Sequence, residues 1–216
     1  MQIRKWIFSG VFLLCPLPQA MAEGDDSIFR TPSVKLSIVK STGNTKVSSK
    51  GQFDDVPFNS SNLITPVLTL IQPPAYFSDD TRWGYHTELS TTYFELDYDK
   101  DDKRYRDGDF EGISFSLTPV LFYQWGDKTL CGHCKSSRLE FGVGLNYLNA
   151  EGDLVTDQGE EVIFDSTGFG FNSHIGFVVN YKQWELSLRY VAPTRIDEQD
   201  VDVRHALSSI GLGYRF

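Results

Sequence analysis

The feature that most constrains the fold is a long alternation of apolar residues with polar or small ones in the C-terminal part of the chain. From position 139 the odd positions are Leu139, Phe141, Val143, Leu145 and Tyr147. A period of two is typical of β-strands with one face in an apolar medium and the other against something polar. Strands of soluble sandwiches are about 5–6 residues long, whereas the alternation over Phe169–Tyr181 is much longer. This length favours strands that cross a membrane in a β-barrel.

The first 22 residues have the pattern of a secretory signal peptide. Basic residues at positions 4 and 5 precede an apolar stretch over 6–17, and Ala-Met-Ala ends at Ala22. The apolar stretch is shorter than the roughly 20 residues that a membrane-spanning helix needs. We therefore predict cleavage after Ala22, with 1–22 as the signal peptide and 23–216 as a single barrel domain in the bacterial outer membrane.

The alternation predicts an all-β, eight-stranded, antiparallel, up-and-down transmembrane β-barrel. We place its strands near 33–41, 62–72, 82–97, 113–125, 138–149, 168–181, 184–195 and 203–216. An even number of strands puts both ends of the chain on one side of the membrane. The connections near 73–81, 126–137 and 182–183 are expected to be periplasmic turns. Those near 42–61, 98–112, 150–167 and 196–202 are expected to be longer, charged outer loops.

Two local features complicate this assignment. Pro119 lies inside the clearest strand, where its missing N–H predicts a bulge or a lost ladder bond. Gly43-Asn44 has the sequence of a tight hairpin turn. We expect that turn inside the first outer loop.

Aromatic residues support a membrane setting. The tryptophans after residue 22 are Trp83, Trp125 and Trp184, and all fall at the predicted periplasmic ends of strands. The opposite ends carry Tyr93, Tyr147, Phe169 and Tyr190. Two belts of this kind are typical of membrane interfaces, where an apolar ring with a polar atom is favoured.

The chain ends on alternating apolar residues and an aromatic: Ile210, Leu212, Tyr214 and Phe216. Together with the signal peptide and the eight strands, this ending resembles the small Gram-negative outer-membrane β-barrels, the class of OmpA, OmpX and OmpW. The resemblance implies that these four residues form an assembly signal that the barrel-assembly machinery recognises. It also implies contact with outer-membrane lipid and lipopolysaccharide, but the class includes anchors, adhesins, channels and a few enzymes, so it does not fix a function.

The inward face of the strands is predicted to be polar. Its ionisable residues include His86, Glu88, Arg138, Glu140, His174, Glu185 and Arg189. An eight-stranded barrel is just wide enough for side chains to fill. We expect an ion-paired plug, in which Arg215 also takes part, and the alternative is a narrow polar channel.

One short motif carries recognisable chemistry. Cys131-Gly132-His133-Cys134 lies in a predicted periplasmic turn. In an oxidising compartment we expect a disulfide between Cys131 and Cys134. A metal or haem-type site with His133 is the second interpretation, and a redox role is the third. We assign no metal and no cofactor to the chain.

The predicted outer loops are acidic. The net charge of −9 argues against a nucleic-acid partner. The stretches Asp97–Glu111 and Glu151–Asp165 contain most of the loop carboxylates. These loops suggest solvation, binding of divalent cations at the lipopolysaccharide surface, or an extracellular ligand of positive charge.

These features favour a non-enzymatic outer-membrane protein whose acidic loops serve surface binding or envelope integrity. A small porin-like solute channel is the alternative. A lipid-modifying enzyme is less favoured, because the sequence has no G-x-S-x-G motif. If the chain were such an enzyme, His205 with Ser208 or Ser209 would be its candidate catalytic set. Without a nucleophile motif, we assign no catalytic residue.

Overall fold

The structure is a computed structural model that describes residues 32–59, 64–79, 81–128, 135–198 and 201–216. These residues form β-strands and their connections. Within the described residues, no helix is long and apolar enough to cross a membrane. The strands are β1 (Ser33–Ser49), β2 (Phe53–Asn59), β3 (Ile64–Ile71), β4 (Ala75–Tyr76), β5 (Trp83–Tyr98), β6 (Asp107–Gly126), β7 (Lys135–Val155), β8 (Glu161–Tyr181), β9 (Trp184–Glu198) and β10 (Val201–Arg215).

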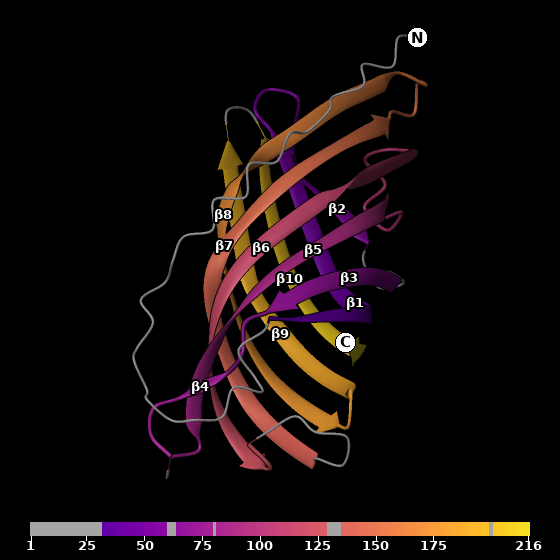
Figure 1. Cartoon of the computed structure of the whole chain (residues 1–216). Helices are drawn as coiled ribbons and strands as arrows, with labels where there is room; N and C mark the ends of the chain where they lie inside the picture. The colour runs from indigo at the N-terminus through magenta and orange to yellow at the C-terminus, as the bar shows by residue number, and fades with distance from the viewer. Residues whose placement is uncertain (1–31, 60–63, 80, 129–134, 199–200) are drawn as a thin grey trace. The chain divides into compact units, whose positions relative to one another are not determined.

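The described strands form a closed antiparallel ring (Figure 1). Closure comes from the pairing of β1 with β10, which runs from Lys35↔Arg215 to Ser49↔Val201. The short strands β2 and β3 both pair with β1 and with β5, and β4 also pairs with β5. These three therefore share one position, and the ten described strands occupy eight positions around the ring. The prediction of an eight-stranded up-and-down barrel is confirmed.

The predicted outer loops were wrong in extent, because most of their residues belong to strands. Strand β1 runs without interruption through Gly43-Asn44, which pair with Leu207 and Ala206, so the expected hairpin turn is absent there. The β7–β8 ladder continues to Val155↔Glu161, inside the stretch 150–167 that the sequence predicts to be a loop. The stretch 98–112 likewise contains the start of β6 at Asp107. The tight turn at 182–183 is as predicted, and Lys182 adopts a φ of 57°.

Proline leaves the expected mark on the ladder between β6 and β7. Pairing is interrupted between Leu117↔Leu145 and Val120↔Gly142. The register of the two strands is the same before and after this gap. Pro119 therefore costs ladder pairs without forming a bulge, because it has no N–H to donate. A register shift does occur between β9 and β10, where His205 and Leu207 face Thr194 and Val191.

The apolar and polar faces of the wall exchange places along the strands. Near the start of β7, Glu140 is buried and Phe141 is exposed. Near its outer end the buried apolar residues are Leu148, Ala150 and Leu154, and the outward residues between them, at 149, 151 and 153, are polar. The direction of the side chains does not change, since odd positions point outward throughout. The outer part of the chain is thus built like a water-soluble β-protein with an apolar interior.

This outer part divides into two groups of strands. The β8–β9 ladder ends at His174↔Val191, so beyond it the described part of β8 pairs with β7 alone. Strands β5–β8 form one group and β9, β10, β1 and β2 form the other, joined by Phe58↔Tyr98 and Asn59↔Asp97. Figure 1 shows the outer ends of β8 and β9 diverging. An apolar cluster fills the space between the groups, with the Phe53 and Phe164 rings 5.1 Å apart.

Candidate functional site

An ion-pair network fills the interior near the predicted periplasmic side. Glu185 on β9 is its first centre, and it contacts Lys35 Nζ at 2.6 Å, Arg215 Nη2 at 2.8 Å and Arg138 Nη2 at 3.3 Å. The cations come from β1, β10 and β7. All four side chains are buried, so the contacts replace water that the charged groups have lost.

Arg189 on β9 is the second centre of the network. Its guanidinium donates to both oxygens of Glu88, at 2.9 and 3.0 Å, and to Glu140 at 2.9 Å. Arg138 also donates to Glu140, which joins the two centres. His86 Nε2 lies 3.2 Å from Glu88 Oε1. The network thus couples strands on opposite sides of the ring.

A metal is a poor fit to this network. One ligand atom each from His86, Glu88 and Glu140 lies within 4.8 Å of the others, which is close enough for a shared ion. The two carboxylates, however, already accept hydrogen bonds from Arg189. A cation in that space would face the guanidinium at close range, and the repulsion between like charges would oppose its binding.

His174 lies beside this network without joining it. Its Nε2 is buried and has no hydrogen-bond partner among the described residues. The ring uses space that Gly142 leaves open, since a Cβ at Gly142 would lie 2.8 Å from His174 Nδ1. The alternation predicted the inward residues of the other strands but missed Lys35. Its signal was its odd position on β1, between the exposed Val34 and Leu36.

The outer aromatic residues mark where the wall leaves the apolar medium. The Phe115, Tyr147 and Phe169 rings form a contiguous row, with 4.9 Å between the Tyr147 and Phe169 centroids. The inner belt includes Trp83, Trp125 and Trp184, whose rings contact neighbouring tyrosines. Eleven residues of β6 span the belts, from Ile113 to Tyr123. A tilted transmembrane strand needs about 9–11 residues.

Directly beyond the outer aromatic row, carboxylates stand side by side across four strands. Glu95 pairs with Glu111, Glu111 with Glu151, and Glu151 with Asp165. The next outward row contains Asp97, Asp109 and Asp153. We call these seven residues the acidic rows. Six of them come from the two acidic stretches, and Glu95 comes from the predicted strand 82–97. All seven lie on the outward face of strands β5–β8.

The acidic rows border a shallow hollow on the outer surface. Glu111, Glu151 and Asp165 line it together with Tyr93, Asn149 and Thr167. Tyr93 donates its hydroxyl to Glu111 Oε2, and Thr167 Oγ1 donates to Asn149 Oδ1 at 2.8 Å. The hollow therefore presents carboxylate and amide oxygens, which are the ligand types of hard cations.

Crowding of like charges is visible in the acidic rows. Partial burial, followed by the nearby Asp153 and Asp97 carboxylates, raises the pKa of Asp109. Partial burial and then Glu161 and Asp107 raise the pKa of Asp153. Each aspartate thus holds a proton more strongly than a free side chain does, because partial burial disfavours its ionised form and the neighbouring carboxylates repel it.

Several predicted site residues lie apart from these two regions. Cys131 and Cys134 fall outside the described residues. Of the assembly signal, Ile210, Leu212 and Phe216 are exposed on the apolar outer face, and the Tyr214 ring contacts Trp184 and Phe216. Ser209 donates its hydroxyl to the Arg189 carbonyl at 3.3 Å, and Ser208 faces outward. The side chain of His205 falls outside the described side chains.

A closed ring with an exposed apolar band between two aromatic belts defines a small transmembrane β-barrel. No protein-family model matches the sequence, and no curated protein matches it either. Solved structures with a similar arrangement include Neisserial surface protein A (NspA), with 13% sequence identity, coverage of 86% of this chain and 97% of that chain, and a TM-score of 0.46.

Two further solved structures are similar to this chain. Ail of Yersinia pestis, in complex with the heparin analogue sucrose octasulfate, is 16% identical, with 86% of this chain and 99% of that chain covered and a TM-score of 0.42. The outer membrane protein OprG of Pseudomonas aeruginosa is 17% identical, with 87% and 98% covered and a TM-score of 0.38.

Proposed function

We propose that this chain is a non-enzymatic surface protein of the bacterial outer membrane, and that its acidic rows bind divalent cations at the outer face of that membrane. The observation that carries the proposal is the placement of seven carboxylates in two cross-strand rows immediately beyond the outer aromatic row. Like charges directly opposite each other destabilise a sheet. A bound cation would offset this repulsion.

The position of the rows selects the partner. The outer aromatic row marks the level of lipid headgroups, and the acidic rows lie next to it on the wall itself. In that layer, lipopolysaccharide carries phosphate groups, and a divalent cation between a wall carboxylate and a phosphate would tie the protein to its surrounding lipid. This role corresponds to the envelope-integrity function that the sequence suggested.

The filled interior favours a closed barrel rather than an open channel. The network around Glu185 and Arg189 fills one level, and the apolar cluster around Phe110 and Phe164 fills another. A hydrated solute would have to displace both. In planar lipid bilayers we therefore expect no single-channel conductance above background, and stable channels would favour the porin-like alternative.

Cation binding can be measured by isothermal titration calorimetry. The purified mature chain, in nanodiscs of neutral lipid, is titrated with CaCl2. The double variant Glu111→Gln/Glu151→Gln removes adjacent carboxylates while keeping their shape. We expect it to weaken calcium binding at least tenfold, because it removes two of the three carboxylates that line the hollow. The matched control is Asp101→Asn/Asp157→Asn, which removes the same charge from connections outside the acidic rows.

The control distinguishes a site from general attraction of counterions. Equal calcium affinities of the two double variants would contradict the proposal. Loss of wild-type calcium binding on addition of NaCl, to an ionic strength equal to that of the CaCl2, would also contradict it. Repeating the titration with lipopolysaccharide in the nanodiscs tests the bridging role. We expect tighter calcium binding there in the wild type, and the same affinity in both lipids would remove lipopolysaccharide from the proposal.

A further inference from the structure

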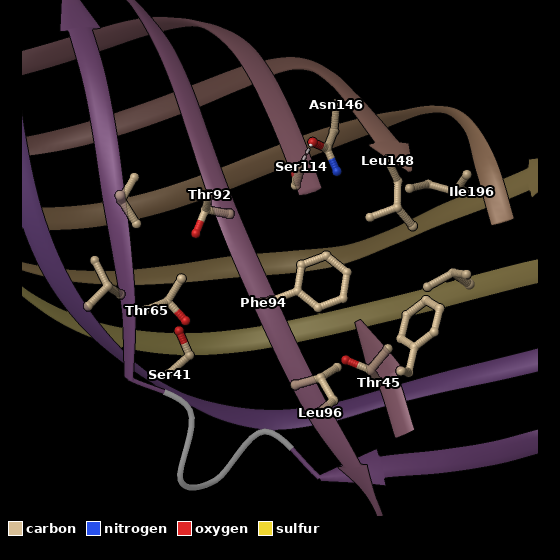
Figure 2. A pocket seen from close by; sticks show the side chains of 14 residues that line it. Ser41, Thr45, Thr65, Thr92, Phe94, Leu96, Ser114, Asn146, Leu148 and Ile196 are labelled. Carbon is tan, nitrogen blue, oxygen red and sulfur yellow. Dashed lines mark hydrogen bonds between the residues drawn. The ribbon is translucent and has the colours of Figure 1, made fainter. Parts of the chain in front are cut away.

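A cavity of about 150 Å³ lies inside the ring (Figure 2). Its lining includes Ser114, Asn146 and Leu148, the chain neighbours of Phe115 and Tyr147, so it lies at the level of the outer aromatic row. It is bounded on the outer side by the apolar cluster, through residues such as Phe110 and Leu148, and it lies on the outward side of the ion-pair network. Seven of the described strands contribute to its lining. Neither the network nor the acidic rows use this space.

The lining is apolar with a few hydroxyl groups. Phe94, Leu96 and Ile196 supply much of the apolar surface. None of the described side chains that line the cavity is charged, so an ionic ligand would lose its hydration without compensation. A cavity lined in this way selects an uncharged, mostly apolar occupant, whose orientation a few polar groups fix.

One of these polar groups lacks a partner. Thr65 is 5% exposed, and its Oγ1 is buried without a hydrogen-bond partner among the described residues. Other polar side chains of the lining are engaged: Ser114 Oγ donates to Asn146 Oδ1 at 2.7 Å, and Thr92 Oγ1 donates to the Pro66 carbonyl at 3.1 Å. Figure 2 shows the hydroxyls of Thr65 and Ser41 facing one another across one side of the cavity.

A buried hydroxyl without a partner is unfavourable, and native structures rarely leave one without a reason. We propose that the cavity binds a small, uncharged, mostly apolar molecule with one hydrogen-bonding group, and that Thr65 Oγ1 is its polar anchor. A cavity of about 150 Å³ lined by apolar side chains is large enough for a single aromatic ring such as benzene. Phenol therefore has the size and the single polar group that the lining suits.

The test uses phenol as the probe and the mature chain in lipid nanodiscs. Methyl NMR follows Val67, Leu148 and Ile196, which line the cavity, while Leu139 and Val143 on the lipid-facing side report phenol that merely enters the lipid. We expect saturable shifts at the cavity methyls and weak, linear shifts at the lipid-facing ones. Linear shifts of equal size in both groups would overturn the proposal.

The anchor is tested with Thr65→Val, which keeps the side-chain shape and removes the hydroxyl. Loss of one hydrogen bond should weaken phenol binding about threefold to tenfold and leave benzene binding unchanged. Thr69→Val is the matched control, since Thr69 is buried on the same face of β3 and does not line the cavity. We expect it to bind both probes like the wild type.

Two outcomes would refute the anchor. One is an unchanged ratio of phenol to benzene affinity in Thr65→Val, and the other is an equal change of this ratio in Thr69→Val. Thermal unfolding without any probe adds a second readout, because removal of an unsatisfied hydroxyl should raise the melting temperature of Thr65→Val. The cavity proposal does not depend on the acidic rows, so the calcium titration can fail without affecting it.

Discussion

The membrane-spanning part of the barrel and its outer extension are built on the same strands with opposite chemistry. In the first part of β7, Arg138 and Glu140 point inward and Phe141 points to lipid. In the outer part of the same strand, Leu154 points inward and Asp153 points outward. The geometry of the strand is constant, so the exchange reflects the medium that surrounds each part. Lipid selects apolar side chains outside, and water selects them inside.

The two parts also differ in what stabilises their interiors. The membrane part satisfies buried charge with guanidinium–carboxylate contacts, such as those of Arg189 with Glu88 and Glu140. The outer part packs aromatic rings, with the Phe110 and Phe164 centroids 5.8 Å apart. A polar interior costs desolvation and gives specificity, whereas an apolar interior is stabilised by burial itself. The outer extension therefore does not need lipid to hold its strands together.

The largest expected effect compares two phenylalanines of β6 on opposite faces. Phe110 is 1% exposed in the apolar cluster, and Phe115 is 46% exposed on the lipid-facing surface. Phe110→Ala should lower the free energy of unfolding by about 3–5 kcal/mol, because it leaves a cavity. Phe115→Ala should cost less, since lipid tails can fill the space. Reversible urea unfolding in lipid vesicles measures both, and an equal loss would contradict an apolar core in the outer extension.

The second comparison places a new cation on the outward face of β7 in each part. Val143 lies between the aromatic belts, and Asp153 lies in the acidic rows. Val143→Arg should destabilise the folded barrel by about 2–4 kcal/mol, because the charge faces hydrocarbon. Asp153→Arg should be neutral or stabilising, because it relieves repulsion among carboxylates. Unfolding in the same vesicles measures both changes in the free energy of unfolding. Similar changes for the two variants would contradict the boundary between the membrane-spanning part and the outer extension.

The smallest effect concerns the pH dependence of the acidic rows. The pKa of Asp109 is raised in the folded chain, so the folded state binds this proton more tightly than the unfolded state. The associated stability is present below the ordinary pKa of aspartate, about 4, and is lost as the pH rises through the higher folded pKa. Asp109→Asn should therefore stabilise the chain at pH 7 by about 0.2–1 kcal/mol.

Thermal melts at low ionic strength check this sign. The gain of Asp109→Asn over wild type should shrink as the pH falls toward 4, where the wild-type carboxyl becomes protonated. It should also shrink as salt is added, because exposed charges are screened. A gain that does not change with pH or salt would show that repulsion between carboxylates is not its cause.

The membrane part was predictable from the sequence, because its signal is local. Alternation such as Leu139, Phe141 and Val143 reports both the strand and its lipid-facing side. The sequence predicts loops for the outer extension because the apolar residues change to even positions after Tyr147, as at Leu148 and Leu154. A break in the phase of an alternation resembles the end of a strand. Its resumption in the opposite phase was the signal that could have identified the extension.

The acidic rows could not be found without the register. Both acidic stretches are evident in the sequence, but the pairing of Glu111 with Glu95 and Glu151 depends on which residues of neighbouring strands face one another. Strand register is set by tertiary pairing and not by local composition. The same limit applies to the cavity, whose anchor Thr65 is one of several inward threonines and is distinguished only by its lack of a partner.

The exchange of media along one strand is the central claim, and spin labelling tests it most directly. A nitroxide is attached to single cysteines in nanodiscs, in a chain with Cys131→Ser and Cys134→Ser. The cysteines replace the outward residues of β7 at positions 139, 141, 143, 145, 147, 149, 151 and 153. Collision with oxygen, which concentrates in lipid, is compared with collision with a water-soluble nickel complex. We predict oxygen-dominated collision through position 147 and nickel-dominated collision from position 149. Nickel-dominated collision along the whole series would contradict the account.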